Sequence, residues 1–237
     1  MADGEPPLTL AERLACLRSQ LPAHARLLAV SKGQPAEAIR AAVMAGQRSF
    51  GESRLQEAVA KQAQLQDLGP LDWHFIGRLQ ANKARGVLRH FNTLHSVDSL
   101  ELAERLQRIA AEDGLSPAVL FQVKLAPDPA KTGFEPDPLR QAWSRLSQLE
   151  PLRPMGLMTI APLGLDHRQL LELFRRCREL AAELGLPELS MGMSGDWREA
   201  VSAGSTWVRL GSALFGPRPV ASGTEPAMNT AAKACTS

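Results

Sequence analysis

Eight short apolar or β-branched segments alternate with longer segments of helical periodicity, and this alternation constrains the fold more than any other feature of the sequence. The segments that we expect to form strands are Leu27–Lys32, Arg48–Glu52, Leu71–Gly77, Thr93–Val97, Ala118–Leu125, Arg153–Ile160, Glu188–Ser194 and Thr206–Gly211. The segments that we expect to form helices are Pro35–Ala45, Arg54–Leu68, Asn82–His90, Ser99–Asp113, Asp137–Leu149, His167–Leu184 and Trp197–Ala203, with a further helix at Thr9–Gln20 before the first strand.

Strands that alternate with helices form a parallel sheet with short crossovers. An open doubly wound sheet would also satisfy the alternation, but eight units within about 190 residues fit a closed barrel better. The sequence therefore predicts an α/β protein, a single (β/α)8 TIM barrel with an extra N-terminal helix.

The last part of the chain differs in composition from the rest. The segment from Pro217 to Ser237 consists of small and polar residues with proline, and it has no periodicity. Such a segment buries too little apolar surface to offset its ordering entropy. We therefore expect one barrel domain over residues 1–218 and a disordered C-terminal tail over residues 219–237.

Charge and patterning exclude several classes of partner. The 27 basic and 25 acidic side chains give a formal net charge of +2, which supplies no electrostatic reason for binding nucleic acid or a membrane surface. No apolar run approaches the roughly 18 residues of a membrane helix, and the first residues lack the pattern of a signal peptide. The three cysteines are far apart and no metal-ligand spacing is present. We expect a cytoplasmic protein without a metal.

Lys32 ends the first predicted strand, in the sequence Val30-Ser31-Lys32. Barrels of this kind build their sites at the carboxyl ends of the strands. If Val30 points into the barrel, the pleat period directs Lys32 inward as well, and a lysine beside low-dielectric walls becomes nucleophilic toward carbonyls. On position alone, a lysine that merely extends its amine into solvent from a strand end is the stronger interpretation.

The loops after the last two strands change that balance. Ser194 and Gly195 follow the seventh strand and lead into a helix, whose first N–H groups can meet an anion. Gly211 and Ser212 follow the eighth strand, and a glycine lets the backbone approach a ligand closely. Each pattern alone is typical of a plain helix cap, but loops seven and eight are the usual phosphate site of this architecture. Together with Lys32 they indicate a phosphorylated carbonyl ligand.

Two further residues have a structural and a functional interpretation. Arg209, within the last strand, needs acceptors if it is buried: it forms either a structural ion pair, for example with Glu52, or a donor to a ring nitrogen of the ligand. His74 lies mid-strand among large apolar residues, where a hydrogen-bonded core histidine is favoured over a catalytic base.

At these residues the chain resembles the pyridoxal phosphate homeostasis protein family, of the YggS/PROSC type, from about Leu8 to Arg218. The motifs that carry the resemblance are Leu28-Ala29-Val30-Ser31-Lys32, Phe50-Gly51-Glu52, the run from Trp73 to Lys83, His95-Ser96-Val97-Asp98, Lys131-Thr132-Gly133-Phe134, the run from Leu189 to Ser194, and Val208-Arg209-Leu210-Gly211-Ser212. Motifs of this length in this order are highly specific.

The resemblance implies an alanine-racemase-like barrel that holds pyridoxal 5′-phosphate (PLP) as a Schiff base on Lys32. It implies phosphate contacts from Ser194, Gly211 and Ser212, with Gly195 beside them, and an arginine, Arg209, that faces the pyridine nitrogen. His74, Met193 and Ser53 are candidates for the ring pocket. Ser53 departs from the family, which has asparagine and then an aromatic residue where this chain has Ser53-Arg54.

The resemblance also implies a cytoplasmic, monomeric protein that buffers PLP or delivers it to recipient apoenzymes, without catalytic turnover. The alternatives are a PLP-dependent amino-acid racemase and a cofactor-free Schiff-base aldolase. Alanine racemases use a tyrosine from another domain as the second acid–base group, whereas this sequence has no tyrosine and its length leaves no room for that domain. We therefore expect a cofactor-binding protein that is not an enzyme.

Overall fold

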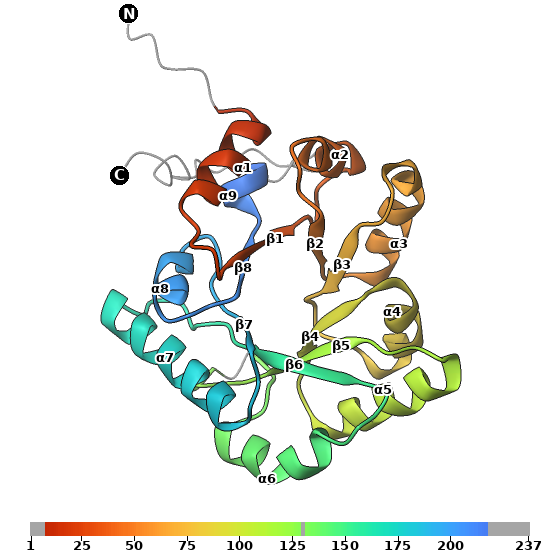
Figure 1. The fold of residues 1–237 in the computed structure, drawn as a ribbon, viewed down its shortest axis with the longest axis vertical. Coiled ribbons are helices and arrows are strands. Elements are labelled where there is room, and N and C mark those ends of the chain that lie inside the picture. Colours follow the sequence, from red (N-terminus) through yellow and green to blue (C-terminus); the bar gives the residue numbers. More distant parts are fainter. Residues whose placement is uncertain (1–7, 129–130, 218–237) are drawn as a thin grey trace, which may run out of the picture.

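Eight parallel strands form a closed barrel in the order of the sequence (Figure 1). The structure, a computed structural model, describes residues 8–128 and 131–217, so the expected tail at 219–237 lies outside the described residues. The strands are β1 (Arg26–Val30), β2 (Ser49–Glu52), β3 (Asp72–Phe75), β4 (Thr93–Val97), β5 (Ala118–Gln122), β6 (Arg153–Met158), β7 (Glu188–Ser190) and β8 (Trp207–Leu210).

Helices surround the barrel, one after each strand, and another precedes β1 (Figure 1). They are α1 (Leu10–Ser19), α2 (Ala36–Met44), α3 (Leu55–Gln64), α4 (Ala84–His90), α5 (Leu100–Asp113), α6 (Pro136–Leu146), α7 (His167–Glu183), α8 (Trp197–Ser202) and α9 (Ser212–Phe215), with short 3-10 turns η1 (Gln66–Leu68) and η2 (Ala81–Lys83). None of the helices in the described ranges is long and apolar enough to cross a membrane.

The register shows how the barrel closes. Ala29 of β1 is paired with Phe50 of β2 on one side and with Leu210 of β8 on the other. The first strand thus joins the last, and the predicted (β/α)8 barrel with an extra N-terminal helix is confirmed.

Six of the eight predicted strands extend past the observed strand at the carboxyl end, and the first and the seventh of them bear on the expected site. The first ends at Val30, so Lys32 lies in the turn that follows it. The seventh ends at Ser190 because Gly192 adopts a φ of +87°, which an extended strand does not allow. The strand ends are therefore followed by backbone that turns across the mouth.

Local capping explains several boundaries. Thr9 and Glu12 form a capping box at the start of α1, and the Ser99 hydroxyl accepts the N–H of Leu102 at the start of α5. The short helix α9 was not predicted, since four residues are too few to show a period. It packs beside α1, where Arg13 Nε donates to the carbonyl of Leu214 at 2.6 Å (Figure 1).

The core has two layers, one between the strands and the helices and the other inside the barrel. Phe75 faces outward, where its ring meets that of Phe91 at 5.2 Å between centroids. Its neighbour His74 faces the interior, where its ring lies 4.9 Å from that of Trp207. Barrel interiors are ordinarily filled by branched apolar side chains, so a buried histidine here needs partners.

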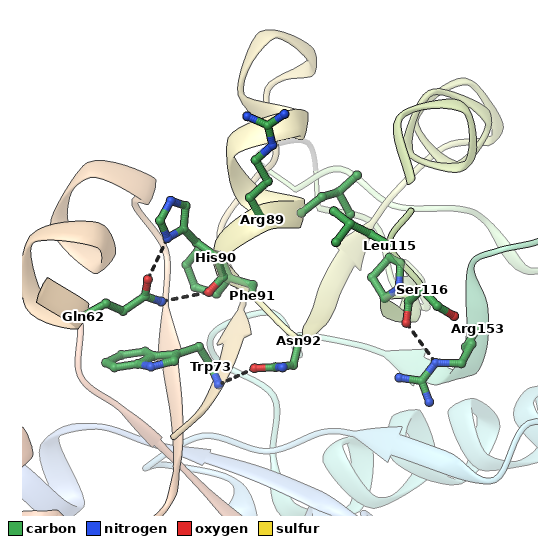
Figure 2. A pocket seen from close by; sticks show the side chains of 11 residues that line it. Gln62, Trp73, Arg89, His90, Phe91, Asn92, Leu115, Ser116 and Arg153 are labelled. Atoms are coloured by element: carbon green, nitrogen blue, oxygen red, sulfur yellow. Dashed lines mark hydrogen bonds between the residues drawn. The ribbon is translucent and has the colours of Figure 1, made fainter. Parts of the chain in front are cut away.

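A hollow of about 500 Å³ lies at the amino ends of β3 to β6, away from the expected site (Figure 2). Its polar groups bond to one another: Gln62 and His90 pair through side chain and backbone at 2.8–2.9 Å, and Arg153 Nε donates to the carbonyl of Ser116 at 3.0 Å. Residues at this end of a barrel ordinarily serve stability.

Candidate functional site

Lys32 lies at the carboxyl end of β1 in a turn that is fixed by backbone bonds. The N–H of Ser31 bonds to the carbonyl of Gly51 at 3.1 Å, and the N–H of Gln34 closes the turn on the carbonyl of Ser31 at 3.0 Å. Ser31 is buried, while Lys32 is exposed at the mouth of the barrel. The turn thus places Lys32, as an exposed residue, at the carboxyl end of β1.

A buried cluster of three charged side chains holds this turn. Lys61 Nζ, from α3, donates to the carbonyl of Ser31 at 2.8 Å, to Glu52 Oε1 at 2.7 Å and to Glu57 Oε1 at 2.6 Å. Glu52 Oε1 also accepts from Ser31 Oγ at 2.7 Å, and Glu57 Oε1 accepts from the N–H of Gly33 at 2.5 Å. The residues on both sides of Lys32 are therefore fixed by side chains of β2 and α3.

Burial and pairing act in opposite directions on the two carboxylates. Burial raises the pKa of Glu52, which is wholly inaccessible, although the Lys61 ammonium and the Ser31 hydroxyl oppose it. Glu57 is less buried, and there the hydrogen bonds from Lys61 and Gly33 outweigh burial and lower its pKa. Lys61 is thus the counterion on which the buried Glu52 depends.

The suggested ion pair between Arg209 and Glu52 is wrong. Glu52 is bonded to Lys61, whereas Arg209 donates from Nη1 to the carbonyl and hydroxyl of Ser190 at 2.6 and 2.8 Å, and from Nη2 to the carbonyl of Thr159 at 2.9 Å. No sequence pattern pointed to Lys61, because it comes from the face of α3 and not from a strand end.

Burial lowers the pKa of Arg209 to about 10, so the guanidinium remains charged at neutral pH. Its side chain comes from β8, within the barrel and close below the mouth, and only 5% of the residue is exposed. The neutral acceptors fix the orientation of the buried guanidinium but do not cancel its positive charge. Arg209 is therefore suited to bind a further acceptor.

The loops after β7 and β8 meet, as the sequence predicted. Ser212 Oγ donates to Ser194 Oγ at 3.2 Å across 18 positions of sequence, and both side chains are exposed at the mouth. Gly195 has open space around its Cα, whereas a Cβ on Gly211 would lie 3.3 Å from the carbonyl oxygen of Val30. Two hydroxyls and two glycines therefore lie beside the end of β1.

The three candidates for the ring pocket lie at different depths. Met193 is 37% exposed at the mouth, and its N–H bonds to Asp196 Oδ1 at 2.6 Å. Ser53 is half-buried just after β2, where its carbonyl leaves no room for a Cβ on Gly77. His74 lies deeper, inside the barrel, with Nε2 bonded to Asp72 and Nδ1 bonded to His95.

Together these groups fit a phosphorylated aldehyde. Strands β7, β8, β1 and β2 are consecutive neighbours around the barrel, so the hydroxyl pair, Gly211 and the Lys32 turn share one arc of the mouth, above Arg209. An amine binds an aldehyde, hydroxyls and open backbone bind a phosphate, and a buried guanidinium binds a ring nitrogen. No group of three potential metal ligands occurs within residues 8–128 and 131–217.

Comparison with known proteins agrees with this chemistry. The sequence model of the family described as "Alanine racemase, N-terminal domain" matches residues 8–219. A pyridoxal phosphate homeostasis protein of Synechocystis sp. is 47% identical over 204 residues, which cover 84% of this chain and 94% of the relative.

Solved structures give the same result. PipY of Synechococcus elongatus with PLP bound is 55% identical, covers 88% of this chain and all of its own, and superposes with a TM-score of 0.85. An alanine racemase of Clostridium difficile superposes with a TM-score of 0.72 at 18% identity, over 89% of this chain and 57% of its own, a likeness of fold alone.

Proposed function

The chain belongs to the pyridoxal phosphate homeostasis protein family, and from that membership we propose that it binds PLP at the mouth of its barrel and takes part in PLP homeostasis. The observation that carries the proposal is the contact between Ser194 and Ser212, which joins the two loops expected to hold a phosphate beside the Lys32 turn. PipY, which shares 55% of its sequence with this chain, was solved with PLP bound.

Each site residue has a proposed role. Lys32 would hold the cofactor covalently: its Nζ would take the place of the aldehyde oxygen, which would leave as water. Ser194, Gly195, Gly211 and Ser212 bind the phosphate through hydroxyl and backbone N–H groups, which is consistent with their exposure and open space.

Arg209, from β8, would donate to the pyridine nitrogen. Ser53 and Met193, which follow β2 and β7, would border the pyridine ring of the cofactor. His74 would line the same pocket from deeper in the barrel. When bound, the cofactor supplies an electrophilic aldehyde, and the residues around it orient and retain it.

The protein is proposed to hold cofactor without catalysing a reaction. A relative that this chain matches over nearly the relative's whole length is named a pyridoxal phosphate homeostasis protein. This favours the homeostasis role over that of a racemase or an aldolase. We propose that residues 1–218 form the binding unit, that the protein is a cytoplasmic monomer, and that it releases PLP to recipient apoenzymes.

Visible absorption of the purified protein tests the cofactor site. We expect a yellow protein, or a colourless one that turns yellow with added PLP, and loss of the visible band on borohydride reduction. Lys32→Ala should abolish borohydride trapping, while Lys124→Ala, a half-exposed lysine paired with Glu135, should leave it intact. A wild-type protein that takes up no PLP would contradict the proposed function.

Pyridoxal tests the phosphate-binding loops separately from Lys32. Charge-assisted hydrogen bonds contribute about 1.5–3 kcal/mol each, so we expect pyridoxal to bind at least about a hundredfold more weakly than PLP. Ser194→Ala combined with Ser212→Ala should narrow this difference. Equal affinities for the two compounds in the wild type would show that the phosphate lies elsewhere.

A further inference from the structure

A continuous chain of hydrogen bonds crosses the inside of the barrel from β8 to β3. Ser190 Oγ accepts from Arg209 Nη1 at 2.8 Å and lies 2.8 Å from His95 Nδ1. His95 Nε2 lies 2.8 Å from His74 Nδ1, and His74 Nε2 lies 2.6 Å from Asp72 Oδ2. Five side chains from four strands are thus joined between the mouth and the opposite end.

All members of this chain except Asp72 are buried. His74, His95 and Ser190 are at most 1% exposed, whereas the Asp72 side chain is 41% exposed at the start of β3. Polar groups inside a barrel replace apolar packing and are costly unless every donor and acceptor is matched. The matching therefore constrains where the protons lie.

The direction of the hydrogen bonds follows from the Arg209 end. A guanidinium only donates, so Ser190 Oγ is an acceptor toward Arg209 and has its own hydrogen to place. His95 Nδ1 lies within reach of that hydrogen, and as an acceptor it carries none. A neutral His95 then bears its proton on Nε2 and donates to His74 Nδ1.

The direction of donation is the same at the Asp72 end of the chain. His74, having accepted at Nδ1, bears its proton on Nε2 and donates it to the Asp72 carboxylate. Burial raises the pKa of Asp72, but hydrogen bonding to His74 helps to lower it overall. Burial, His74 and Arg209 all lower the pKa of His95, which agrees with a neutral ring. This arrangement satisfies each link and places no second cation beside Arg209.

We propose that Ser190 and His95 are positioning residues for Arg209, in a one-directional hydrogen-bond chain that runs from Arg209 through Ser190, His95 and His74 to Asp72. This inference rests on the proposed function, because it gives the orientation of the ring-nitrogen donor as the reason for the chain. With its acceptor removed, the guanidinium is left with backbone carbonyls alone and turns more freely below the cofactor.

Nitrogen NMR of the apoprotein labelled in its histidines tests the direction without any cofactor. We expect His95 to be neutral and protonated on Nε2 at pH 7, with Nδ1 unprotonated, and His74 to carry a proton on Nε2. A His95 ring protonated on Nδ1, or on both nitrogens, would overturn the proposed direction whether or not the protein binds PLP.

PLP affinity and the visible absorption maximum test the positioning role. Ser190→Ala should weaken PLP binding about threefold to tenfold and shift the absorption maximum, while Ser190→Thr, which keeps the hydroxyl, should restore both. Ser205→Ala is the matched control, because its buried hydroxyl lies within hydrogen-bond distance of the carbonyls of Leu189, Met191 and Trp207 without joining the chain.

The outcomes separate this inference from the proposed function. If the wild type binds PLP but Ser190→Ala and Ser205→Ala behave alike, or Ser190→Thr fails to restore the absorption maximum, the positioning role is wrong and the function stands. If the wild type binds no PLP, the function is wrong, and the NMR result alone decides the direction of the chain.

Discussion

At the scale of residues, the groups at the mouth of the barrel are supported by buried side chains: Lys61 bonds the Lys32 turn, and Ser190 bonds Arg209. Lys32, Ser194 and Ser212 follow from the rule that barrels carry their sites at carboxyl ends, and Ser194 and Ser212 are indeed in contact. Lys61 and Ser190 do not follow from it, because only the folded chain brings α3 under the Lys32 turn and β7 beside Arg209.

Lys61 allows a test of the buried charge cluster. Lys61→Met should lower the free energy of unfolding by about 3–5 kcal/mol, since it leaves the carboxylate of Glu52 buried without a counterion. Urea unfolding measures this, and adding Glu52→Gln to Lys61→Met should recover part of the loss. Arg140→Met, which removes an exposed pair with Glu183, is the control and should change stability little. Equal effects of the two single changes would show that Glu52 does not depend on Lys61.

His95 predicts a dependence of stability on pH. Burial, His74 and Arg209 hold its pKa well below the usual value of about 6.5, so below that pH the unfolded chain binds a proton that the native ring does not. Stability should therefore fall as pH drops from 7 toward 5, by up to about 1.4 kcal/mol per pH unit from this group. His95→Gln should flatten this slope.

Leu94→Ala, a buried change on the same strand without a titrating group, is the control for that experiment. Leu94→Ala should lower the free energy of unfolding by the same amount at every pH. The dependence of that free energy on pH should therefore remain as steep as in the wild type. A His95→Gln protein with the full slope would mean that the proton uptake belongs to other groups.

At the scale of elements, the existence of each strand and major helix could be predicted, and its ends often could not. Thr9 and Ser99 cap the first residues of α1 and α5 through side-chain hydrogen bonds, and residues of this type can be recognised as caps in a sequence. The end of β7 depended instead on the conformation of Gly192, and α9 depended on packing against α1. Those two features are tertiary, and they shape the loops at the proposed phosphate site.

Two glycines in the β7–α8 loop form a matched pair for testing this loop. Gly192 has a φ of +87°, and a Cβ there would lie 2.7 Å from Ala200 Cβ and 2.8 Å from Trp197 Cα. Gly192→Ala should therefore destabilise the protein by about 2–4 kcal/mol through strain and overpacking. Gly195→Ala, which meets nothing within 4 Å, should change thermal stability little. Equal melting temperatures of the two variants would show that Gly192 does not adopt this strained and closely packed conformation.

At the scale of the whole molecule, the closed barrel could be predicted from the alternation of eight strands with helices. A parallel sheet of eight strands closes when its first and last strands pair, as β1 and β8 do here. The shape of the mouth could not be predicted in the same way. The mouth combines the Lys32 turn with the loops after β7 and β8 and the guanidinium of Arg209. These parts come from opposite ends of the sequence, and they meet only when the barrel closes.

The chemistry of the whole site predicts no amino-acid racemisation at an enzymatic rate. Racemisation needs an acid and a base on opposite faces of the α-carbon. Lys32 can serve one face, but the sequence contains no tyrosine for the other. Burial raises the pKa of the Cys177 thiol to about 12, and both ring nitrogens of His74 are engaged by Asp72 and His95. Within the described residues, neither side chain is placed to replace it.

Arg209 gives a second, independent reason. With a pKa of about 10 it is charged at neutral pH. At its proposed position beside the pyridine nitrogen, the guanidinium would disfavour protonation of that nitrogen, which would weaken the ring as an electron sink. The test is to incubate PLP-loaded protein with L-alanine in deuterated water and to follow chirality and α-deuteration, with free PLP at equal concentration as the control. We expect turnover far below about one per second, the low end of ordinary enzymes, and turnover at that rate would favour the racemase. Both features oppose turnover, and neither involves Lys32 or the loops proposed to bind the phosphate, which is the combination that a protein proposed to retain and release PLP requires.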